Sequence, residues 1–581
     1  MEKRVFLAIF LSFGVLALYQ AYFAPPVPAP RPAVTETSAP TAQPAAAPAA
    51  SAPAGTPTTV AAAPAASAVR AVVADTAARD IAVETDTVSA VFSTKGGALK
   101  SWKLKRYFDG ARQPLELVPQ NMPDSFPKPL SIATDDASVS ATLRAALYKP
   151  SAESLTLGAG AGVLEFEYQD ESGLAARKKF QFQPDGKAYL VVVDASVALA
   201  GKALPVVVEW GPAIGLGYDV EGAQAFPIRA IQLSDKVERL AVDDITEQSR
   251  YESALRFAGV EDQYFLSAAL PQFHQASAPQ TVRVDYQPVT LPLLNDPENR
   301  TRALMAYSVR TPGAAALAVF MGPKDLDVLR AINPELTGAI DFGMFRFLVV
   351  PLLQALKWVN GFLGNWGWSI VVLTILINLI IFPLRHRSMV SMRKMQAIQP
   401  EVKAIQERFA KYKITDPERQ KMNQEMMALY KQRGVNPASG CVPMLLTMPV
   451  LFAFYAMLSA AIEVRGAHFF GWLHDLSLKD PYYITPILMG GTMFWQQKMM
   501  PTTADPIQAK MFLFMPIIFT VMFLTAPSGL VVYWFVSNLL AIGQQYMTNR
   551  MIGPPPRLVA PPAKPIKTVK AISGSSGKPK A

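Results

Sequence analysis

The residues of this sequence with the clearest functional promise are polar side chains inside strongly apolar segments. Thr374 and Asn378 stand four positions apart in WGWSIVVLTILINLIIFPL, so they share one face of a helix. Later apolar segments hold the other members of this set: Thr447, Tyr533, Ser537, Asn538 and Gln544. Hydroxyls and carboxamides in such a setting either form hydrogen bonds between helices or line a water-containing groove. The residues alone leave both interpretations open.

These side chains do not form a combination that makes or breaks covalent bonds. The apolar segments contain no acid–base pair, no nucleophile beside a base and no HExxH sequence. The one cysteine, Cys441, excludes an internal disulfide and a cysteine-rich metal site. The histidines lack the spacing of metal ligands: His274, His386, His468 and His474. We therefore predict a protein without catalytic residues, bound metal or cofactor.

The composition predicts a membrane protein. Of 581 residues, 51% are hydrophobic and only 17% are charged, and the mean hydropathy is +0.20. Soluble domains carry about 25% charged residues. The formal net charge of +10 is compatible with binding to nucleic acid or to anionic lipid, and its position along the chain decides between them.

The chain begins with a predicted membrane anchor and a tether. Residues 1–4 include Lys3 and Arg4, and a charge-free apolar run follows at 5–23. This run is long enough to span a bilayer, and no small-x-small cleavage spacing ends it, so we predict an uncleaved signal anchor. A cleaved signal peptide is the simpler alternative. Residues 24–79 are rich in Ala, Pro, Thr and Ser, which predicts an extended tether without a core of its own.

Residues 80–335 predict a large β-domain. Apolar and polar side chains alternate in VLEFEYQDESG and QTVRVDYQPVTL, which is typical of half-buried strands. KKFQFQPDGKAYLVVVDASV predicts a β-hairpin across Pro184, Asp185 and Gly186. Because disulfides are excluded, we expect an all-β sandwich that relies on its hydrophobic core.

Residues 340–360 predict an amphipathic helix. Apolar side chains recur there at spacings of three and four, among polar ones: Phe345, Leu348, Leu352, Leu356 and Val359. Such a helix lies at the membrane surface. The alternative is a core helix of the preceding β-domain.

Long charge-free runs follow and predict five further membrane spans. The sequence APSG predicts a tight turn that divides the last run, Met511–Asn549, into two spans. The predicted spans are 364–384, 441–462, 482–499, 511–526 and 529–547, and loops at 463–481 and 500–510 connect the middle ones. With the N-terminal anchor, this gives a polytopic α-helical membrane protein with six transmembrane helices.

Basic residues outside the spans set the predicted orientation. Residues 385–435 hold far more basic than acidic side chains, and the tail at 548–581 holds basic side chains only. Segments rich in Lys and Arg stay in the cytoplasm. Both termini are therefore predicted to be cytoplasmic, with the β-domain and the 463–481 loop on the outer side. Since topology explains the positive charge, no nucleic-acid partner is needed.

Residues 385–435 also carry a helical pattern. Apolar residues recur at spacings of three and four before and after ITDPER: Ile398, Val402, Ile405, Phe409, Tyr412, Met422, Met426 and Leu429. Asp416 suits an N-cap and Pro417 the first helical position, so we predict an antiparallel helical hairpin with a coiled-coil seam. The hairpin is either a self-contained packing unit or a basic arm that meets anionic lipid, a nascent chain or the ribosome. Basic residues mark its start: Arg385, Arg387, Arg393 and Lys394.

Several stretches resemble the YidC-type membrane protein insertases. They are NWGWSIVVLTILINLIIFPL, SMVSMRKMQAIQPEVKAIQERF, NPASGCVPMLLTMPVLFAFYAML, HDLSLKDPYYITPILMGGTMFWQQKMMPTTADPIQAKMFLFMPIIFT and PSGLVVYWFVSNLLAIGQQ. Together they cover most of residues 345–546, in order. The anchor and the β-domain resemble the Gram-negative branch of that family. STKGGALKSWKLKRY is similar to the start of its periplasmic domain, a β-sandwich that resembles sugar-mutarotase folds.

The resemblance implies an insertase and chaperone of the bacterial inner membrane that works alone or with the Sec translocon. In the family, five core spans form a groove open to cytoplasm and lipid but closed to the periplasm. A polar substrate segment enters this groove while an apolar segment slides along the third and fifth spans. The implied partners are nascent membrane proteins, Sec components, the ribosome, the signal-recognition machinery and anionic lipid. The implied groove residues are Thr374, Asn378, Thr447, Tyr533, Trp534, Ser537 and Asn538.

Two positions depart from the family, and two other functions stay open. Asn378 stands where the family usually has Arg, one turn after a Thr, and Trp534 stands where it often has Tyr. The first departure puts in doubt any mechanism that needs a fixed positive charge deep in the groove. One alternative function is a membrane-anchored carbohydrate-binding or carbohydrate-active β-domain, for which His274 is the only histidine between residues 81 and 333. The other is a small-molecule transporter, although internal repeats and intramembrane charges are missing.

Overall fold

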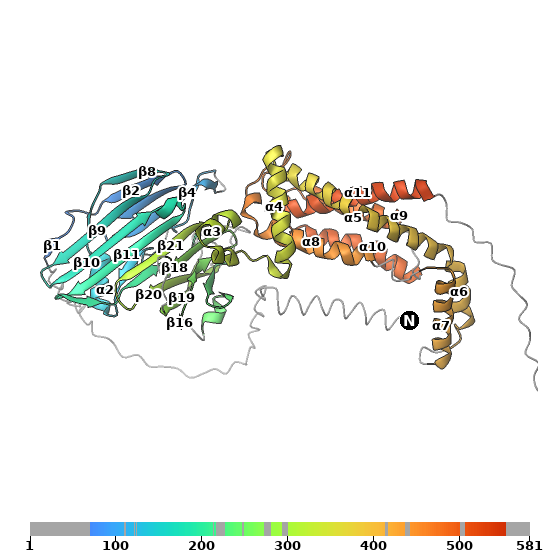
Figure 1. Cartoon of the computed structure of the whole chain (residues 1–581), viewed down its shortest axis with the longest axis horizontal. Coiled ribbons are helices and arrows are strands. Elements are labelled where there is room, and N and C mark those ends of the chain that lie inside the picture. The colour runs from blue at the N-terminus through green and yellow to red at the C-terminus, as the bar shows by residue number, and fades with distance from the viewer. Residues whose placement is uncertain are drawn as a thin grey trace, which may run out of the picture. The chain divides into compact units, whose positions relative to one another are not determined.

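The structure, a computed structural model, covers the β-domain and most of the following helices (Figure 1). It describes residues 70–109, 112–120, 122–123, 125–212, 214–215, 227–246, 249–271, 273, 281–292, 300–412, 416–435, 442–499 and 506–552, with the backbone alone at 442–447, 506–512 and 552. The predicted N-terminus, anchor and most of the tether lie outside these residues, as do His274, the Thr447 side chain and most of the basic tail. The chain divides into two compact units, of which Pro400–Gly434 belongs to one and Val69–Gln399 with Val435–Ala581 forms the other.

The predicted β-hairpin is confirmed. Strands β10 (Leu174–Phe182) and β11 (Leu190–Leu199) pair antiparallel, with Phe180 opposite Val193. Every second residue of β10 is buried, as the two-residue period of a strand requires. The connection contains a 3-10 turn, η1 (Pro184–Gly186), in which Asp185 has a φ of 55° and Gly186 a φ of 72°. Asp and Gly are among the residues that best tolerate this left-handed backbone, so the turn sets the register of the hairpin.

Three sheets make up the β-domain. The eleven-stranded sheet contains β10 and β11 with β1 (Ala71–Val73), β7 (Lys149–Pro150), β9 (Gly162–Asp170), β12 (Lys202–Leu204), β14 (Arg229–Leu233), β15 (Val237–Leu240), β17 (Phe257–Glu261), β18 (Phe265–Leu270) and β21 (Ala315–Pro323). One five-stranded sheet contains β6 (Ser131–Ala133), β13 (Val207–Trp210), β16 (Arg250–Ser253), β19 (Val282–Pro292) and β20 (Thr301–Arg310). The other contains β2 (Asp80–Thr85), β3 (Val88–Ser93), β4 (Ala98–Phe108), β5 (Pro114–Glu116) and β8 (Ser154–Gly158).

The strand order shows how long connections build the large sheet. Its main path runs β1-β9-β10-β11-β21-β18-β17-β14-β15. The late strand β21 therefore pairs with β11 and β18, in the middle of the sheet. Strand β1 pairs with β9, so the sheet begins within residues 24–79, which the sequence pattern predicted to be tether.

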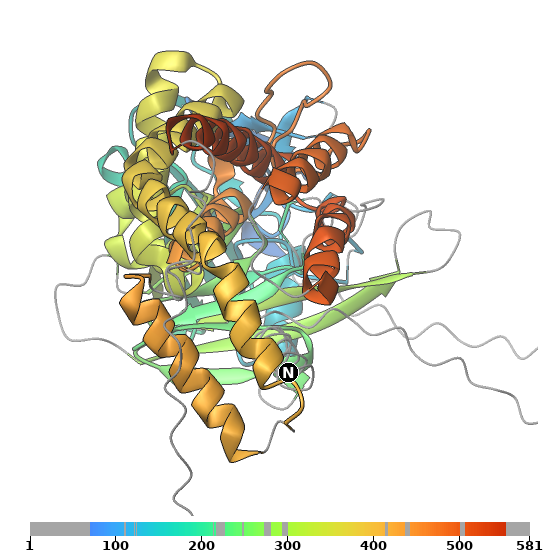
Figure 2. The same cartoon turned by 90° about the vertical axis from the view of Figure 1, so that its right-hand side faces the viewer.

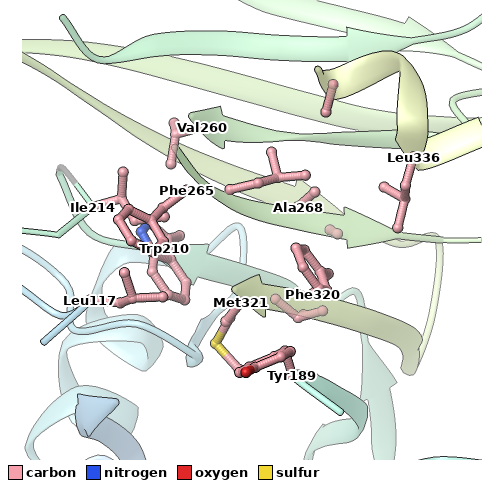
Figure 3. Close-up of a cluster of buried hydrophobic side chains, with 14 of the residues drawn as sticks. Leu117, Tyr189, Trp210, Ile214, Val260, Phe265, Ala268, Phe320, Met321 and Leu336 are labelled. Atoms are coloured by element: carbon pink, nitrogen blue, oxygen red, sulfur yellow. The ribbon is translucent and has the colours of Figure 1, made fainter. Parts of the chain in front are cut away.

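The two five-stranded sheets pack on the eleven-stranded sheet and enclose the core. Phe92 of β3 lies against Phe180 of the large sheet, with ring centroids 4.9 Å apart. Tyr286 of β19 donates a hydrogen bond across the layers to the Ile231 carbonyl oxygen at 3.0 Å. Figure 3 shows another part of this core, where buried side chains from several strands and loops meet: Leu117, Trp210, Val260, Phe265, Phe320 and Met321. This layered packing is what the predicted sandwich requires.

Helices dominate the chain after β21. Short helical segments are α2 (Ala137–Ala145), η2 (Asp243–Thr246), α3 (Leu326–Ile332), η3 (Pro334–Ala339), η4 (Gly343–Phe345) and η6 (Ile462–Val464). Long helices are α4 (Arg346–Leu363), α5 (Trp366–Ala397), α8 (Val442–Ala460), α9 (Ile484–Met499), α10 (Pro506–Phe523) and α11 (Ser528–Ile552). Among the described residues, α5 is the one helix whose length and apolar composition suffice to cross a membrane, and α8 and α10 contain shorter apolar stretches.

Helix α4 is amphipathic, in the region where the spacing predicts such a helix. Val349, Leu353 and Leu356 are buried, and the helix packs against α5 and α8. Two aromatic side chains, Phe347 and Phe362, are 74% exposed. Gly364 caps the helix in a left-handed conformation with a φ of 63°, and Asn365 caps α5 by accepting a hydrogen bond from the Trp368 amide. The glycine and the Asn cap together allow the chain to turn sharply between the two helices.

Helix α5 continues past the predicted end of its span at 384. It runs unbroken to Ala397, so the first part of the predicted hairpin, from 385, belongs to this helix. Pro383 lies inside the helix without ending it. The change from apolar to basic residues marks a change of surroundings, and it does not by itself break a helix, since Arg, Met and Lys are good helix formers.

The helices of the larger unit pack in a defined order. Helix α5 packs along α11, α11 along α9, and α9 along α10. Helix α8 packs mainly on α4 and touches α5 and α11 over shorter lengths, and in the described residues it shares no extended contact with α10. Gly490 lets α9 approach α10 closely, because a Cβ atom there would overlap Thr520 Oγ1.

The smaller unit holds an antiparallel helical hairpin. It is built from α6 (Gln399–Arg408) and α7 (Pro417–Gln432), which Figure 2 shows side by side. Ion pairs of 2.7 Å join Arg408 to Glu425 and Glu401 to Arg433, so the start of α6 lies by the end of α7. Asp416 accepts a hydrogen bond from the Glu418 amide, which confirms it as the N-cap. The buried seam is formed by Val402, Ile405 and Met422.

Candidate functional site

Three polar side chains of α5 form a hydrogen-bonded line along the helix. The fully buried Thr374 hydroxyl donates to the Ile370 carbonyl oxygen at 2.6 Å. Asn378 Nδ2 donates to the Thr374 carbonyl oxygen at 2.8 Å, and Asn378 Oδ1 accepts from Arg385 Nη1 at 2.8 Å. Long helical side chains lean toward the N-terminus of their helix, so Arg385 can reach back about two turns. A guanidinium thus meets the carboxamide that the sequence singles out.

Helix α11 adds Tyr533 to the same place. The Tyr533 ring is buried and stacks on Phe454 of α8, with centroids 4.0 Å apart and planes at 12°. The Tyr533 hydroxyl interacts electrostatically with Arg385. Ser537 lies one turn further along α11, and its buried Oγ atom has no hydrogen-bond partner among the described residues. We call five residues the polar cluster: Thr374, Asn378, Arg385, Tyr533 and Ser537. It lies where α5 packs against α11.

The other predicted groove residues face elsewhere. The Trp534 ring packs against two phenylalanines of α10, with ring centroids 4.8 and 5.4 Å away. Asn538 Nδ2 donates to the Met489 carbonyl oxygen at 3.4 Å and to Thr492 Oγ1 at 3.3 Å, both in α9. A helix turns about 100° per residue, so side chains that are adjacent in sequence meet different partner helices. The structure therefore brings four of the predicted groove residues together and separates two from them.

Polar contacts continue from the cluster toward the ends of α5 and α11. Gln544 Nε2 donates to the Phe382 carbonyl oxygen at 3.3 Å, and His386 Nδ1 lies 3.4 Å from Thr548 Oγ1. Arg393 donates to Asn549 Oδ1. Among the residues predicted to mark the hairpin start, Arg387 and Lys394 are exposed.

Three members of this polar face escaped the sequence-based prediction: His386, Thr548 and Asn549. The signal that could reveal them is spacing, because Gln544 and Gln545 precede Thr548 and Asn549 by three to five positions and so lie on nearby faces of α11.

At the opposite ends of these helices, the loop between α8 and α9 is fastened by hydrogen bonds. The Asp480 carboxylate is buried and accepts from Trp472 Nε1 at 3.0 Å, from the Tyr482 amide at 3.0 Å and from both the amide and hydroxyl of Thr485. Burial alone would raise the pKa of Asp480, but the hydrogen bonds from Thr485 and its neighbours hold that pKa below its ordinary value. The Ser528 amide donates to the Leu478 carbonyl oxygen at 2.7 Å, which ties the loop to the start of α11.

A cavity of about 120 Å³ lies in the β-domain, on different elements from the polar cluster. Its lining is mostly apolar, with five prolines at 119, 123, 127, 129 and 212. Lys100, Gln120 and Lys128 are its polar members, and Gln120 Nε2 is bonded to the carbonyl oxygens of Lys100 and Val118.

Two family models match the chain. The model described as 60Kd inner membrane protein matches residues 358–554, and the model described as YidC periplasmic domain matches residues 80–355. The first match contains the whole polar cluster. The second contains the strands from β2 to β21 and the start of α4.

Full-length relatives are similar as well. The chain is 34% identical over 570 residues to the membrane protein insertase YidC of Geotalea daltonii, which covers 95% of this chain and 100% of that protein. It is 37% identical over 563 residues to that of Geobacter metallireducens, covering 95% and 99% of the two chains.

Solved structures with similarity include a crystal structure of an active YidC insertase with its first transmembrane domain resolved. It is 18% identical and covers 82% of this chain and 95% of that chain, with a TM-score of 0.34. A galactose mutarotase related enzyme from Lactobacillus acidophilus is 11% identical and covers 42% of this chain and 97% of that chain, with a TM-score of 0.25.

Proposed function

Because this chain belongs to the YidC family of membrane protein insertases, we propose that substrates enter at the polar cluster of α5 and α11 and that Arg385 supplies the positive charge there. The cluster lines a groove that receives the polar segment of a nascent inner-membrane protein. Insertion makes no covalent bond, so the residues act by binding and orienting, without a catalytic residue or cofactor.

The hydrogen bond between Arg385 and Asn378 carries this proposal. An arginine whose backbone sits at the centre of a bilayer costs at least ~2.5 kcal/mol by insertion scales. Arg385 instead follows the apolar stretch that ends at Leu384, and its flexible stem covers apolar surface while its head group finds a polar partner. The charge that the family usually carries at position 378 is thus delivered from residue 385.

Energetics explain why such a cluster helps a substrate. Each backbone group that enters hydrocarbon without a hydrogen-bonding partner costs several kcal/mol. Hydroxyls, a carboxamide and a guanidinium offer alternative partners along the route, which lowers that cost for the polar segment. The final state is stabilised when the substrate's apolar helix is surrounded by lipid.

Exposed apolar side chains on α8 and α10 support a route for the substrate's apolar segment. Among its described residues, helix α10 exposes six large ones: Leu513, Phe514, Ile517, Ile518, Val521 and Met522. Helix α8 exposes Tyr455, at 51%, and Phe452. These are the third and fifth of six proposed spans, and the substrate helix slides along them.

The proposed topology places the working parts on two sides of the inner membrane. Six spans, counting the N-terminal anchor, leave both termini and the α6–α7 hairpin in the cytoplasm. The hairpin meets the nascent chain, the ribosome and its signal-recognition machinery, and anionic lipid. The β-domain and the loop fastened by Asp480 lie in the periplasm, and the chain works alone or beside the Sec translocon.

Variants that move the positive charge from position 385 to position 378 test the proposal. Newly made single-span reporters, with an acidic or a neutral translocated tail, are followed by protease protection in cells depleted of their own insertase. At matched protein levels, Arg385→Gln should lower insertion of the acidic reporter roughly threefold to tenfold, a barrier change of ~1 kcal/mol, and affect the neutral reporter little. The double variant Asn378→Arg with Arg385→Gln should restore the acidic reporter.

The matched control is Lys236→Gln, which removes an exposed charge from the β-domain. Parent-like insertion of the acidic reporter by Arg385→Gln would overturn the proposal. Equal loss of both reporters would also count against it, because general damage to the fold lacks charge selectivity.

A further inference from the structure

One lysine joins three elements on the side of α4 that faces the β-domain. Lys357 Nζ, from α4, lies 2.6 Å from Glu463 Oε1 in η6, which directly follows α8. It also lies 2.7 Å from Asp327 Oδ2 and 3.5 Å from Asp325 Oδ2, both at the start of α3 in the β-domain. Helix α4 is therefore tied by one ammonium group both to the end of α8 and to the last helix of the β-domain.

Burial distinguishes these partners. The Glu463 side chain is 9% exposed and that of Asp327 is 60% exposed, so solvent screens the Asp327 pair far more. Burial raises the pKa of the Glu463 carboxyl, and the Lys357 ammonium counters this effect. Asp325 also caps α3 by accepting from the amides of Asp327 and Val328. The Lys357–Glu463 pair is thus the least exposed of the three, and removal of the Lys357 charge would leave the Glu463 carboxylate buried without its counter-charge.

The ends of α4 and α8 are linked to the β-domain by further polar contacts. Gln263 Nε2 donates to the Ser459 carbonyl oxygen at 2.5 Å, and Arg465 Nη1 donates to the Phe108 carbonyl oxygen at 3.2 Å. The Arg346 guanidinium, at the start of α4, donates to Thr337 Oγ1 at 2.9 Å. These contacts hold the termini of the two helices, whereas Lys357 holds α4 near its other end.

Lys357 stands at the border between the two faces of α4. Leu353 and Leu356 are buried, and Trp358 and Phe362 are 64% and 74% exposed. A charged group that is fixed by partners on both sides defines how far the helix can roll about its axis. Rolling would move the exposed aromatic side chains and the α8 contact together.

We propose that Lys357 is a positioning residue for insertion: its ion pairs with Glu463, Asp327 and Asp325 fix α4 against α8 and the β-domain. The fixed helix in turn holds α8, along which the substrate's apolar segment passes. This inference rests on the proposed function, because it concerns the support of that route. It adds a residue outside the polar cluster that touches no substrate.

The test measures helix position and insertion separately. Spin labels are placed at two exposed sites, Phe362 on α4 and Tyr455 on α8, in a chain whose Cys441 is replaced by serine. Lys357→Met should broaden and shift the distance distribution between the labels and slow reporter insertion about threefold to tenfold. Lys357→Arg should restore both readouts, since it keeps the charge. Lys479→Met, at an exposed lysine of the α8–α9 loop, is the matched control.

A second variant covers the case in which Lys357→Met does not accumulate. Glu463→Gln keeps the lysine and the side-chain shape and should shift the label distance in the same direction. An unchanged distance in either variant overturns the positioning role, as does slower insertion without a change of distance. Because the label distance does not depend on the polar cluster, parent-like insertion by Arg385→Gln would overturn the proposed function and leave this inference standing.

Discussion

The ammonium group of Lys178 lies 2.7 Å from the carbonyl oxygen of Gly96, inside the core of the β-domain. Two more carbonyl oxygens accept from it, those of Gly97 at 3.0 Å and Leu130 at 3.2 Å, and the Tyr148 ring centroid is 5.3 Å away. Lys178 thus joins β10 to the segments before β4 and β6. Burial removes the amine from water, and this loss of solvation lowers the pKa of Lys178 to about 7.

This burial predicts a pH dependence of stability. Between about pH 7 and 10.5, the unfolded chain keeps the Lys178 proton and the folded chain releases it, so the free energy of unfolding rises with pH in that window. Each pKa unit corresponds to ~1.4 kcal/mol. Lys178→Met should therefore flatten the rise in the unfolding temperature of the β-domain between pH 7 and 9.5, followed by tryptophan fluorescence. Lys179→Met is the control, and an equal pH response of parent and Lys178→Met would contradict the prediction.

We predict that alanine is destabilising at Gly490 and tolerated at the neighbouring Gly491. Gly490→Ala should place a methyl group against Thr520 and separate α9 from α10, at a cost of roughly 1–3 kcal/mol. Gly491→Ala should be neutral or slightly stabilising, because open space surrounds that position. Thermal unfolding in detergent measures both. The pair Gly490→Ala with Thr520→Ala should recover part of the loss, and the explanation fails if the two single variants unfold alike.

We predict that an apolar replacement of Asn378 impairs insertion and that a positively charged one does not. Asn378→Leu removes the partner of Arg385 and of the Thr374 carbonyl oxygen, so insertion should fall about threefold or more, consistent with the loss of a hydrogen bond to a charged group. Asn378→Arg should be tolerated, because the resemblance to YidC-type insertases implies that this position accepts Arg. Protease protection of a reporter decides between them. If the leucine variant inserts normally and the arginine variant fails, Asn378 serves only helix packing.

We predict that the α6–α7 hairpin moves independently of α5 and that insertion requires the hairpin. Its own seam and its two ion pairs stabilise it as a unit, so its amides should exchange hydrogen with kinetics separate from those of α5. Replacement of residues 400–434 by a Gly/Ser linker should abolish reporter insertion while the β-domain unfolds at its usual temperature. Full activity of that variant, or exchange of the hairpin amides in step with α5, would refute the respective half of the prediction.

Local patterns predicted the elements of this protein better than the contacts between them. The β10–β11 hairpin and the Asp416 cap follow from a few adjacent residues, and the structure confirms both. The burial of Lys178, on the same face of β10 as Phe180, was not predicted. The end of α5 was not predicted either, because hydropathy reports the surroundings of a helix and not its length.

Contacts between distant segments lay beyond such reasoning. Lys357 meets Asp325 and Glu463 only because the end of β21, the start of α3 and the end of α8 lie near one another, which no local pattern shows. Trp534 and Tyr533 are adjacent in sequence, yet the partner helices determine that one packs on α10 and the other on α8. To predict the hydrogen bond from Arg385 to Asn378, one must know the direction of the arginine side chain as well as the helix face that it occupies.

The lack of an extended contact between the described residues of α8 and α10 has a kinetic consequence. A bundle closed on every side must separate two of its own helices before a guest helix can enter, and the strength of that seam then limits the rate. On the proposed route, a guest helix would displace lipid chains from the exposed Tyr455 and Ile518 and would leave the packing of α5 on α11, α11 on α9 and α9 on α10 intact. The speed of entry should therefore follow the fluidity of the surrounding bilayer, so that the membrane itself serves as the gate.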